Sequence, residues 1–131
     1  MANFITSDYA VDIVRGLLAT ITRPKYMITT PDFKSLGQSR PAEYIVINSL
    51  PIGSNVMQKC YVNVNYHVKD QGAGIPDITK INSGSAAVMV ILEKVTESNY
   101  MIDYEGQETF REDALGEHYS NLRFSFKFIN K

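Results

Sequence analysis

The chain has 131 residues, of which 44% are hydrophobic and 21% are charged, and its formal net charge is −1. This length and composition are typical of one globular domain with a substantial core, so we expect a single domain over residues 1–131. The near-neutral charge excludes a general electrostatic attraction to nucleic acid or to anionic membranes.

An amphipathic helix is predicted near the start of the chain. Apolar residues recur there at three- and four-residue spacing, at Ala10, Ile13, Val14, Leu17, Leu18 and Ile21. Ser7 is the expected N-cap, because its hydroxyl can accept a hydrogen bond from a free amide of the first turn. Asp8 is favourable beside it, and Pro24 is expected to end the helix after about four turns.

The next segment, residues 23–43, is the least regular part of the chain. It holds three prolines and one glycine, so we expect a long loop with at most a short strand near residues 26–29. Before Glu43, the segment has four bases and one acid, Asp32, and therefore a net charge of +3. The bases are Arg23, Lys25, Lys34 and Arg40. This loop is either solvated surface, or a segment that becomes ordered on a partner or faces nucleic acid.

Two long strands are predicted from alternating side chains. In residues 58–69, the apolar face consists of Cys60, Val62, Val64, Tyr66 and Val68. Residues 119–129 repeat this pattern, and their apolar face consists of Leu122, Phe124, Phe126 and Phe128. We expect both apolar faces to be buried, with Cys60 as a small core residue. His67 lies on the polar face and is expected at the surface.

Shorter strands accompany these two. Residues 44–50 should pair with residues 58–69 as an antiparallel hairpin, because turn-forming residues separate the two strands. Residues 100–105 alternate as another strand. Residues 106–117 are expected to form an acidic connection to the last strand.

A second helix is predicted over residues 76–96, with Pro76 in its first turn. Gly84 lies near its middle and would cost about 1 kcal/mol relative to alanine, unless the helix must approach the sheet closely there. The order helix, hairpin, helix, hairpin predicts an α+β fold: an antiparallel, possibly mixed, β-sheet with two helices packed on one face. One core cluster is expected beneath the second helix, formed by Val62, Val64, Tyr66, Leu92, Phe124 and Phe126.

No metal or cofactor pattern stands out in the sequence. His67 and His118 lack the spacing of metal ligands. The glycines that precede the second helix are followed by Asp77 at the place where a dinucleotide fingerprint has its third glycine, and an acid there would repel a pyrophosphate. We therefore expect no cofactor and no metal.

Catalytic and membrane patterns are likewise not apparent. The best candidates for a pair of catalytic carboxylates are Asp103, Glu105 and Glu108. Exposed acids on a strand are, however, far commoner than catalytic ones, so we expect no enzyme activity. The longest apolar run, residues 86–92, is too short to cross a bilayer. The first residues do not have the pattern of a signal peptide, and no membrane partner is expected.

Three local features carry a family resemblance. A proline-preceded strand over residues 40–47 follows the loop after the first helix, an alternating strand over residues 61–68 follows it, and a phenylalanine-rich strand over residues 122–128 closes the order. In this order of elements the chain resembles the tail terminator and tail-completion proteins of long-tailed bacteriophages. The related head-closure and neck proteins of the same apparatus share the pattern.

The resemblance implies a structural virion protein without an active site. Such a protein forms a ring, expected to be a hexamer, at the head-proximal end of the tail, with the tail tube and the head connector as partners. It is assembled in the host bacterial cytoplasm and resides in the virion tail, where the basic loop could contact DNA in the lumen non-specifically. The alternative function is a small α+β ligand-binding or regulatory domain, and an enzyme is the third.

Charge is distributed unevenly along the chain. Residues 93–117 hold eight acids and two bases, whereas the remainder holds six acids and eleven bases. A head-to-tail ring needs two different complementary patches on each subunit, and this asymmetry suggests where they lie. The predicted subunit interface joins a basic patch to an acidic one, with the residues Lys25, Lys34, Arg40, Glu108, Glu112 and Asp113.

Overall fold

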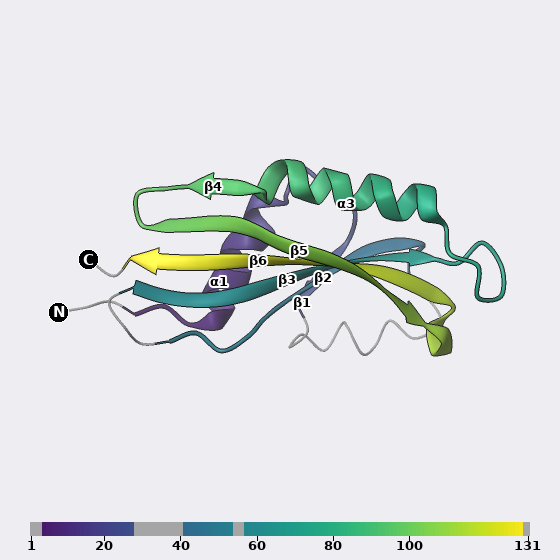
Figure 1. Ribbon diagram of the computed structural model, residues 1–131, viewed down its shortest axis with the longest axis horizontal. Helices are drawn as coiled ribbons and strands as arrows, with labels where there is room; N and C mark the ends of the chain where they lie inside the picture. Colours follow the sequence, from purple (N-terminus) through teal and green to yellow (C-terminus); the bar gives the residue numbers. More distant parts are fainter. Residues whose placement is uncertain (1–3, 28–40, 54–56, 130–131) are drawn as a thin grey trace.

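The computed structural model describes residues 4–27, 41–53 and 57–129, and its frame is a six-stranded sheet (Figure 1). The strands are β1 (Lys25–Met27), β2 (Glu43–Ser49), β3 (Met57–Lys69), β4 (Lys94–Thr96), β5 (Tyr100–Glu112) and β6 (Glu117–Ile129). Their order across the sheet is β1-β2-β3-β6-β5-β4. β1 runs parallel to β2 and every other neighbouring pair is antiparallel, so the predicted α+β fold with a mixed sheet is confirmed.

Helices α1 (Ser7–Leu17) and α3 (Ile78–Leu92) pack on one face of this sheet, as expected. Helix α1 contacts β2 and β3, whereas α3 contacts β3, β6, β5 and β4. Buried side chains of both helices join the alternate residues of the central strands in a single core. All six residues of the predicted core cluster belong to it, and Cys60 is buried there as well.

The helix ends differ from those predicted. Thr6, not Ser7, is the N-cap of α1, and its hydroxyl accepts from the Tyr9 amide at 3.1 Å. Threonine and serine both have a hydroxyl that can cap a helix, so the sequence could not show which of these two adjacent residues is the N-cap. The helix also ends at Leu17, well before Pro24, because the chain turns there and Leu18 becomes fully buried.

The second helix is shorter than predicted at its carboxyl end. Asp77 is its N-cap and accepts from the Lys80 amide at 3.2 Å, so this acid occupies the helix start where a pyrophosphate would bind. The helix ends at Leu92, and the β-branched residues Val95 and Thr96 form β4 against β5 instead. No helix within the described ranges is long and apolar enough to cross a membrane.

Gly84 lies where α3 approaches the sheet most closely. A Cβ atom at this position would lie 2.2 Å from Cε1 of Tyr66, which is far inside van der Waals contact. The expected reason for a glycine in the middle of this helix is therefore confirmed. The contact also sets the height of the helix above β3.

Strand β5 is longer than predicted. Residues 106–112, expected as part of an acidic connection, continue the ladder with β6 up to the pair Glu112–Glu117. A bulge between Tyr104 and Gly106 shifts the register by one residue, and this shift interrupts the alternation on which the prediction rested. The actual connection is the 3-10 helix Asp113–Leu115, followed by Gly116 in a left-handed conformation.

Candidate interaction surfaces

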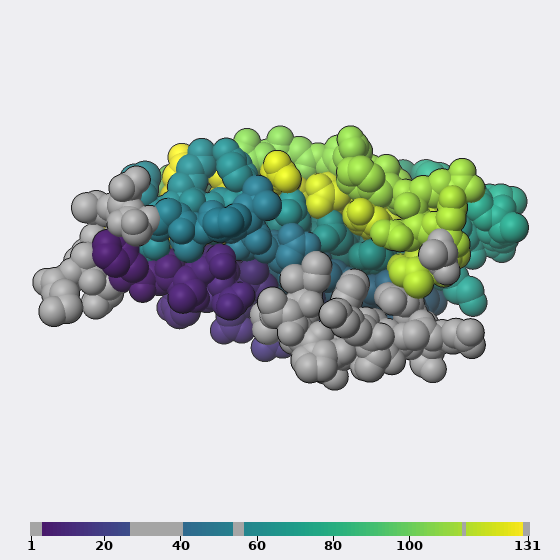
Figure 2. Space-filling view, turned by 90° about the horizontal axis from the view of Figure 1, so that it is seen from below, coloured from purple at the N-terminus to yellow at the C-terminus, as the bar shows by residue number. Residues whose placement is uncertain are grey.

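The structure describes four of the six predicted interface residues, and it places the base and the acids among them on opposite sides of the sheet. Lys25 lies on β1, while Glu108 and Glu112 lie on β5 and Asp113 follows it; strands β2, β3 and β6 separate the two groups. Lys34 and Arg40 lie outside the described residues. In the view of Figure 2, α1 (purple) and the turn between β5 and β6 (yellow-green) lie on different sides of the molecule. Among the described residues, Lys25 is therefore not brought together with Glu108, Glu112 or Asp113 within one subunit.

The acidic edge is formed by the part of β5 that follows the bulge. Glu108 pairs in register with Asn121, and Glu112 pairs with Glu117, on the face of the sheet opposite the helices. Asp113 is exposed, but its carboxylate accepts from Arg111 Nε at 2.6 Å. Part of the negative charge of this edge is therefore neutralised locally, and Glu108 and Glu112 carry most of what remains.

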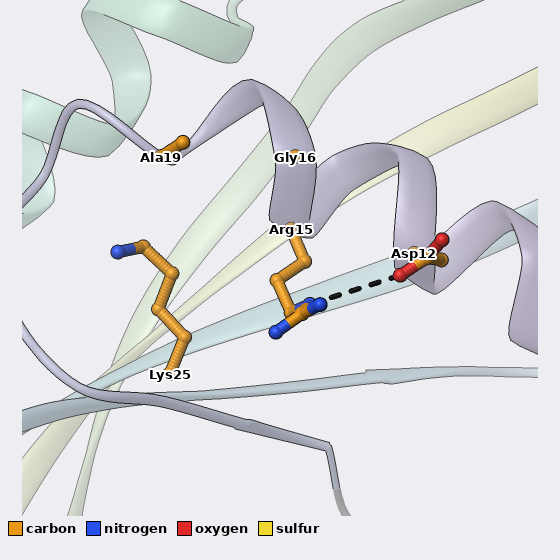
Figure 3. A pocket seen from close by; sticks show the side chains of 5 residues that line it. All are labelled: Asp12, Arg15, Gly16, Ala19 and Lys25. Carbon is orange, nitrogen blue, oxygen red and sulfur yellow. Dashed lines mark ion pairs between the residues drawn. The ribbon is translucent and has the colours of Figure 1, made fainter.

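The basic edge has a shallow pocket of about 440 Å³ between α1 and β1, lined by Asp12, Arg15, Gly16, Ala19 and Lys25 (Figure 3). Arg15 forms an ion pair with Asp12 at 3.7 Å. The Lys25 ammonium donates to the Ile21 and Arg23 carbonyl oxygens. Burial, and then the nearby charge of Arg15, lower the pKa of Lys25 from its ordinary value.

The remaining base of this edge is already paired. Arg23 Nη2 lies 2.9 Å from Glu43 Oε2, and Glu43 is mostly buried. Within the residues that the structure describes, Lys25 is therefore the cation of this edge that lacks an acidic partner. It faces the helix side of the sheet, in register with Ile45, whereas Glu108 and Glu112 face the other side.

A row of rings crosses the face of the sheet that the helices leave uncovered. Tyr44, His67, Tyr119 and Phe110 are successive register partners on β2, β3, β6 and β5. The His67 ring stacks between Tyr44 and Tyr119, with centroid distances of 4.6 and 4.7 Å. Phe110 stacks on Tyr119 at 5.3 Å. This row ties the pair β2 and β3 to the pair β6 and β5, and these two pairs are far apart in the sequence.

The expectation that His67 is a surface residue is wrong. The residue is only 7% exposed, and its Nδ1 lies 2.9 Å from Oε1 of the buried Glu117. The same carboxylate accepts from the Tyr44 hydroxyl at 2.5 Å. Strand alternation placed His67 on the correct face, but alternation does not show whether that face is covered.

The second histidine lies on the other face of the sheet. His118 Nδ1 is 2.6 Å from Asp70 Oδ1, next to the turn that leads to α3. Among the described residues, no group of three or more His, Cys, Asp or Glu side chains has the geometry of a metal site. Asp103 and Glu108 pair with Ser125 and Asn121 on the same face of the sheet, whereas Glu105, at the bulge, has no register partner on β6.

Sequence reasoning did not find that half of β5 is a free sheet edge. β4 pairs only with residues 101–103 of β5, so the residues after Tyr104 have no strand on their outer side within the described ranges. The strand order could not be read from the chain, because β6 inserts between β3 and β5. The bulge and the short strand β4, which together leave this edge uncovered, became apparent only in the structure.

A scan against protein-family models found no match, and a search of curated proteins found none either.

Proposed function

We propose that this protein is a structural subunit of a bacteriophage tail, a tail terminator or tail-completion protein that forms a ring at the head-proximal end of the tail. The observation that supports the proposal is that Lys25, on β1, and the acids Glu108 and Glu112, on β5, lie on opposite sides of one sheet. A heterologous, head-to-tail contact joins two different patches of neighbouring subunits, and repeating it by rotation closes a ring. The order of elements, with two helices on one face, agrees with the family that the sequence resembles.

In the proposed ring, the acidic edge of one subunit faces the basic edge of the next. Exposed charges of this kind guide encounter and register, whereas apolar contacts supply most of the affinity. The tail tube and the head connector would bind the two rims of the ring, and the basic loop would face DNA in the lumen. The site of action would be the virion tail.

Charge reversal tests the proposal. The triple variant Glu108→Lys, Glu112→Lys and Asp113→Lys should fold but fail to assemble, and adding Lys34→Glu and Arg40→Glu should partly restore assembly. A matched control, Asp8→Lys, Glu93→Lys and Glu97→Lys, changes the net charge equally at exposed positions away from the acidic edge. Assembly is measured by light scattering and electron microscopy, with the protein alone and with the tail tube protein of the same phage.

Two outcomes would overturn this assignment. One is a wild-type protein that stays at 14.7 kDa both alone and with tail tubes. The other is a triple variant that assembles as well as wild type at every salt concentration, which would remove these patches from the interface.

The pocket beside Lys25 favours the second candidate, a small ligand-binding or regulatory domain, because Lys25 and Arg15 both line it. A monomer that binds small anions at this pocket, and loses the binding on Arg15→Gln, would support this candidate over the ring.

A further inference from the structure

The half of β5 that follows the bulge offers unpaired backbone groups to solvent. On the outer side of β5, the last hydrogen bond among the described residues runs from the Tyr104 amide to the Glu93 carbonyl at 3.1 Å. Residues 107–111 are all exposed. An exposed edge of this kind is a template for pairing with another extended chain.

The register identifies which amides point outward. Backbone groups of an antiparallel strand alternate between its two sides, and the Tyr104 amide points away from β6. The bulge adds one residue, so Gly106 faces β6 in register with Arg123. The outward set after the bulge is therefore Gln107, Thr109 and Arg111. Within the part of the chain that the structure describes, no strand pairs with these amides and carbonyls, so they can accept a seventh strand.

A groove runs beside this edge on the helix side. It has a volume of about 340 Å³ and is lined by Asn82, Ser85, Met89, Tyr104, Gln107 and Thr109. The Gln107 side-chain amide is fixed by donating to Thr109 Oγ1 and Ser120 Oγ, both at 2.9 Å. Ser85 Oγ donates to the same Ser120 hydroxyl at 2.7 Å and so links α3 to the sheet. The groove walls are thus held in place without a ligand.

Charge on this edge selects the incoming strand. Residues 105–113 contain four acids and one base, and that base, Arg111, is already bonded to Asp113. Two copies of this edge would place like charges opposite each other, which disfavours a symmetric pairing of β5 with β5. A strand with basic side chains facing Glu108 and Glu112 would instead be attracted.

We propose that the free edge of β5, together with the groove beside α3, is a strand-addition site for an extended segment with basic side chains at alternate positions. One face of the added strand places small side chains in the groove, and the other places its cations beside Glu108 and Glu112. The proposal does not depend on the ring, because any partner with such a segment satisfies it.

The test uses the full chain and a capped synthetic heptapeptide, Thr-Lys-Val-Lys-Val-Lys-Thr, in which lysines alternate with uncharged residues. Hydrogen exchange read by NMR should show new protection of the Gln107, Thr109 and Arg111 amides. The Gly106 and Glu108 amides should not change, because they already bond to β6. A peptide with glutamate in place of lysine should give no protection.

Two variants separate backbone pairing from charge. Thr109→Pro removes one outward amide without breaking the ladder to β6. It should bind about tenfold more weakly than Thr109→Val, which loses the same hydroxyl but keeps the amide, so the difference between the two variants isolates the backbone contribution. Glu108→Gln with Glu112→Gln should weaken binding by about three- to tenfold and reduce its salt dependence.

Three results would overturn the proposal. The first is that the lysine peptide at millimolar concentration protects no amide from hydrogen exchange. The second is that the lysine and glutamate peptides give equal protection. The third is that the protected amides are not those of Gln107, Thr109 and Arg111. If Thr109→Pro fails to fold, the charge variant and the peptide pair still decide the question.

Discussion

Replacing Gly84 by alanine should destabilise the protein, although alanine is the better helix former. Propensity alone favours alanine by about 1 kcal/mol. The new Cβ, however, would lie 2.2 Å from Cε1 and 2.3 Å from Cζ of Tyr66. Tyr66 is only 3% exposed and its hydroxyl donates to Glu43 Oε1 at 2.8 Å, so the ring cannot move away without losing that bond.

The magnitude follows from these opposing effects. Forcing a methyl group into a packed core costs about 1–3 kcal/mol, and the lost hydrogen bond adds about 1 kcal/mol. After the gain in helix propensity is subtracted, Gly84→Ala should lower the free energy of unfolding by about 1–3 kcal/mol. The assay is urea denaturation followed by circular dichroism. The dependence of the unfolding free energy on urea concentration should be the same for the variant and the wild-type protein, so that their stabilities can be compared.

A second helical glycine provides the matched control. A Cβ at Gly16 of α1 would have nothing within 4 Å, so Gly16→Ala should stabilise the protein by about 0.5–1 kcal/mol. In a Tyr66→Leu background, the cost of Gly84→Ala should shrink, because the clashing ring is gone. A Gly84→Ala variant as stable as wild type would refute the close contact between α3 and β3.

Two further predictions concern α1 and the core. Thr6→Ala should cost about 1 kcal/mol of stability, while Ser7→Ala should cost little, because only the Thr6 hydroxyl caps the helix; thermal melts of the two variants compare them directly. Burial raises the pKa of the Cys60 thiol to about 11, against the opposing effect of a hydrogen bond with Ser49. The thiol ionises in the unfolded chain from about pH 9 but stays protonated in the folded one, so its contribution to stability is present below pH 9 and lost as pH rises toward 11. Cys60→Ala should therefore show a shallower loss of stability over this range in pH-dependent denaturation, and an equal slope in both proteins would contradict the buried thiol.

The local patterns predicted the faces of the central strands well, because burial on one side of a sheet imposes a period of two on its residues. Val62, Val64, Phe124 and Phe126 all lie where alternation placed them. The pattern failed at Glu105. The extra residue in the bulge reverses the alternation, so residues 106–112 were predicted to be a connection although they continue β5.

Features that depend on long-range pairing could not be predicted. The end of α3 at Leu92 depends on β4 finding β5, and the burial of His67 depends on partners that are 23 and 52 residues away in the chain, Tyr44 and Tyr119. The opposite placement of Lys25 and Glu108 follows from the strand order, which no local pattern encodes. The charge asymmetry was visible in the sequence, but the free edge of β5 was not.

The central position of β6 has a consequence for how the protein folds during synthesis. β6 is the last strand to be made, yet it pairs with all 13 residues of β3 and with most of β5. At ~5–20 residues per second, roughly 60 residues separate the completion of β3 from that of β6, a delay of about 3–12 s. During this time the edge of β3 that pairs with β6 has no strand partner. The central part of the sheet can therefore form only once β6 has been synthesised, through non-local pairing that is intrinsically slow.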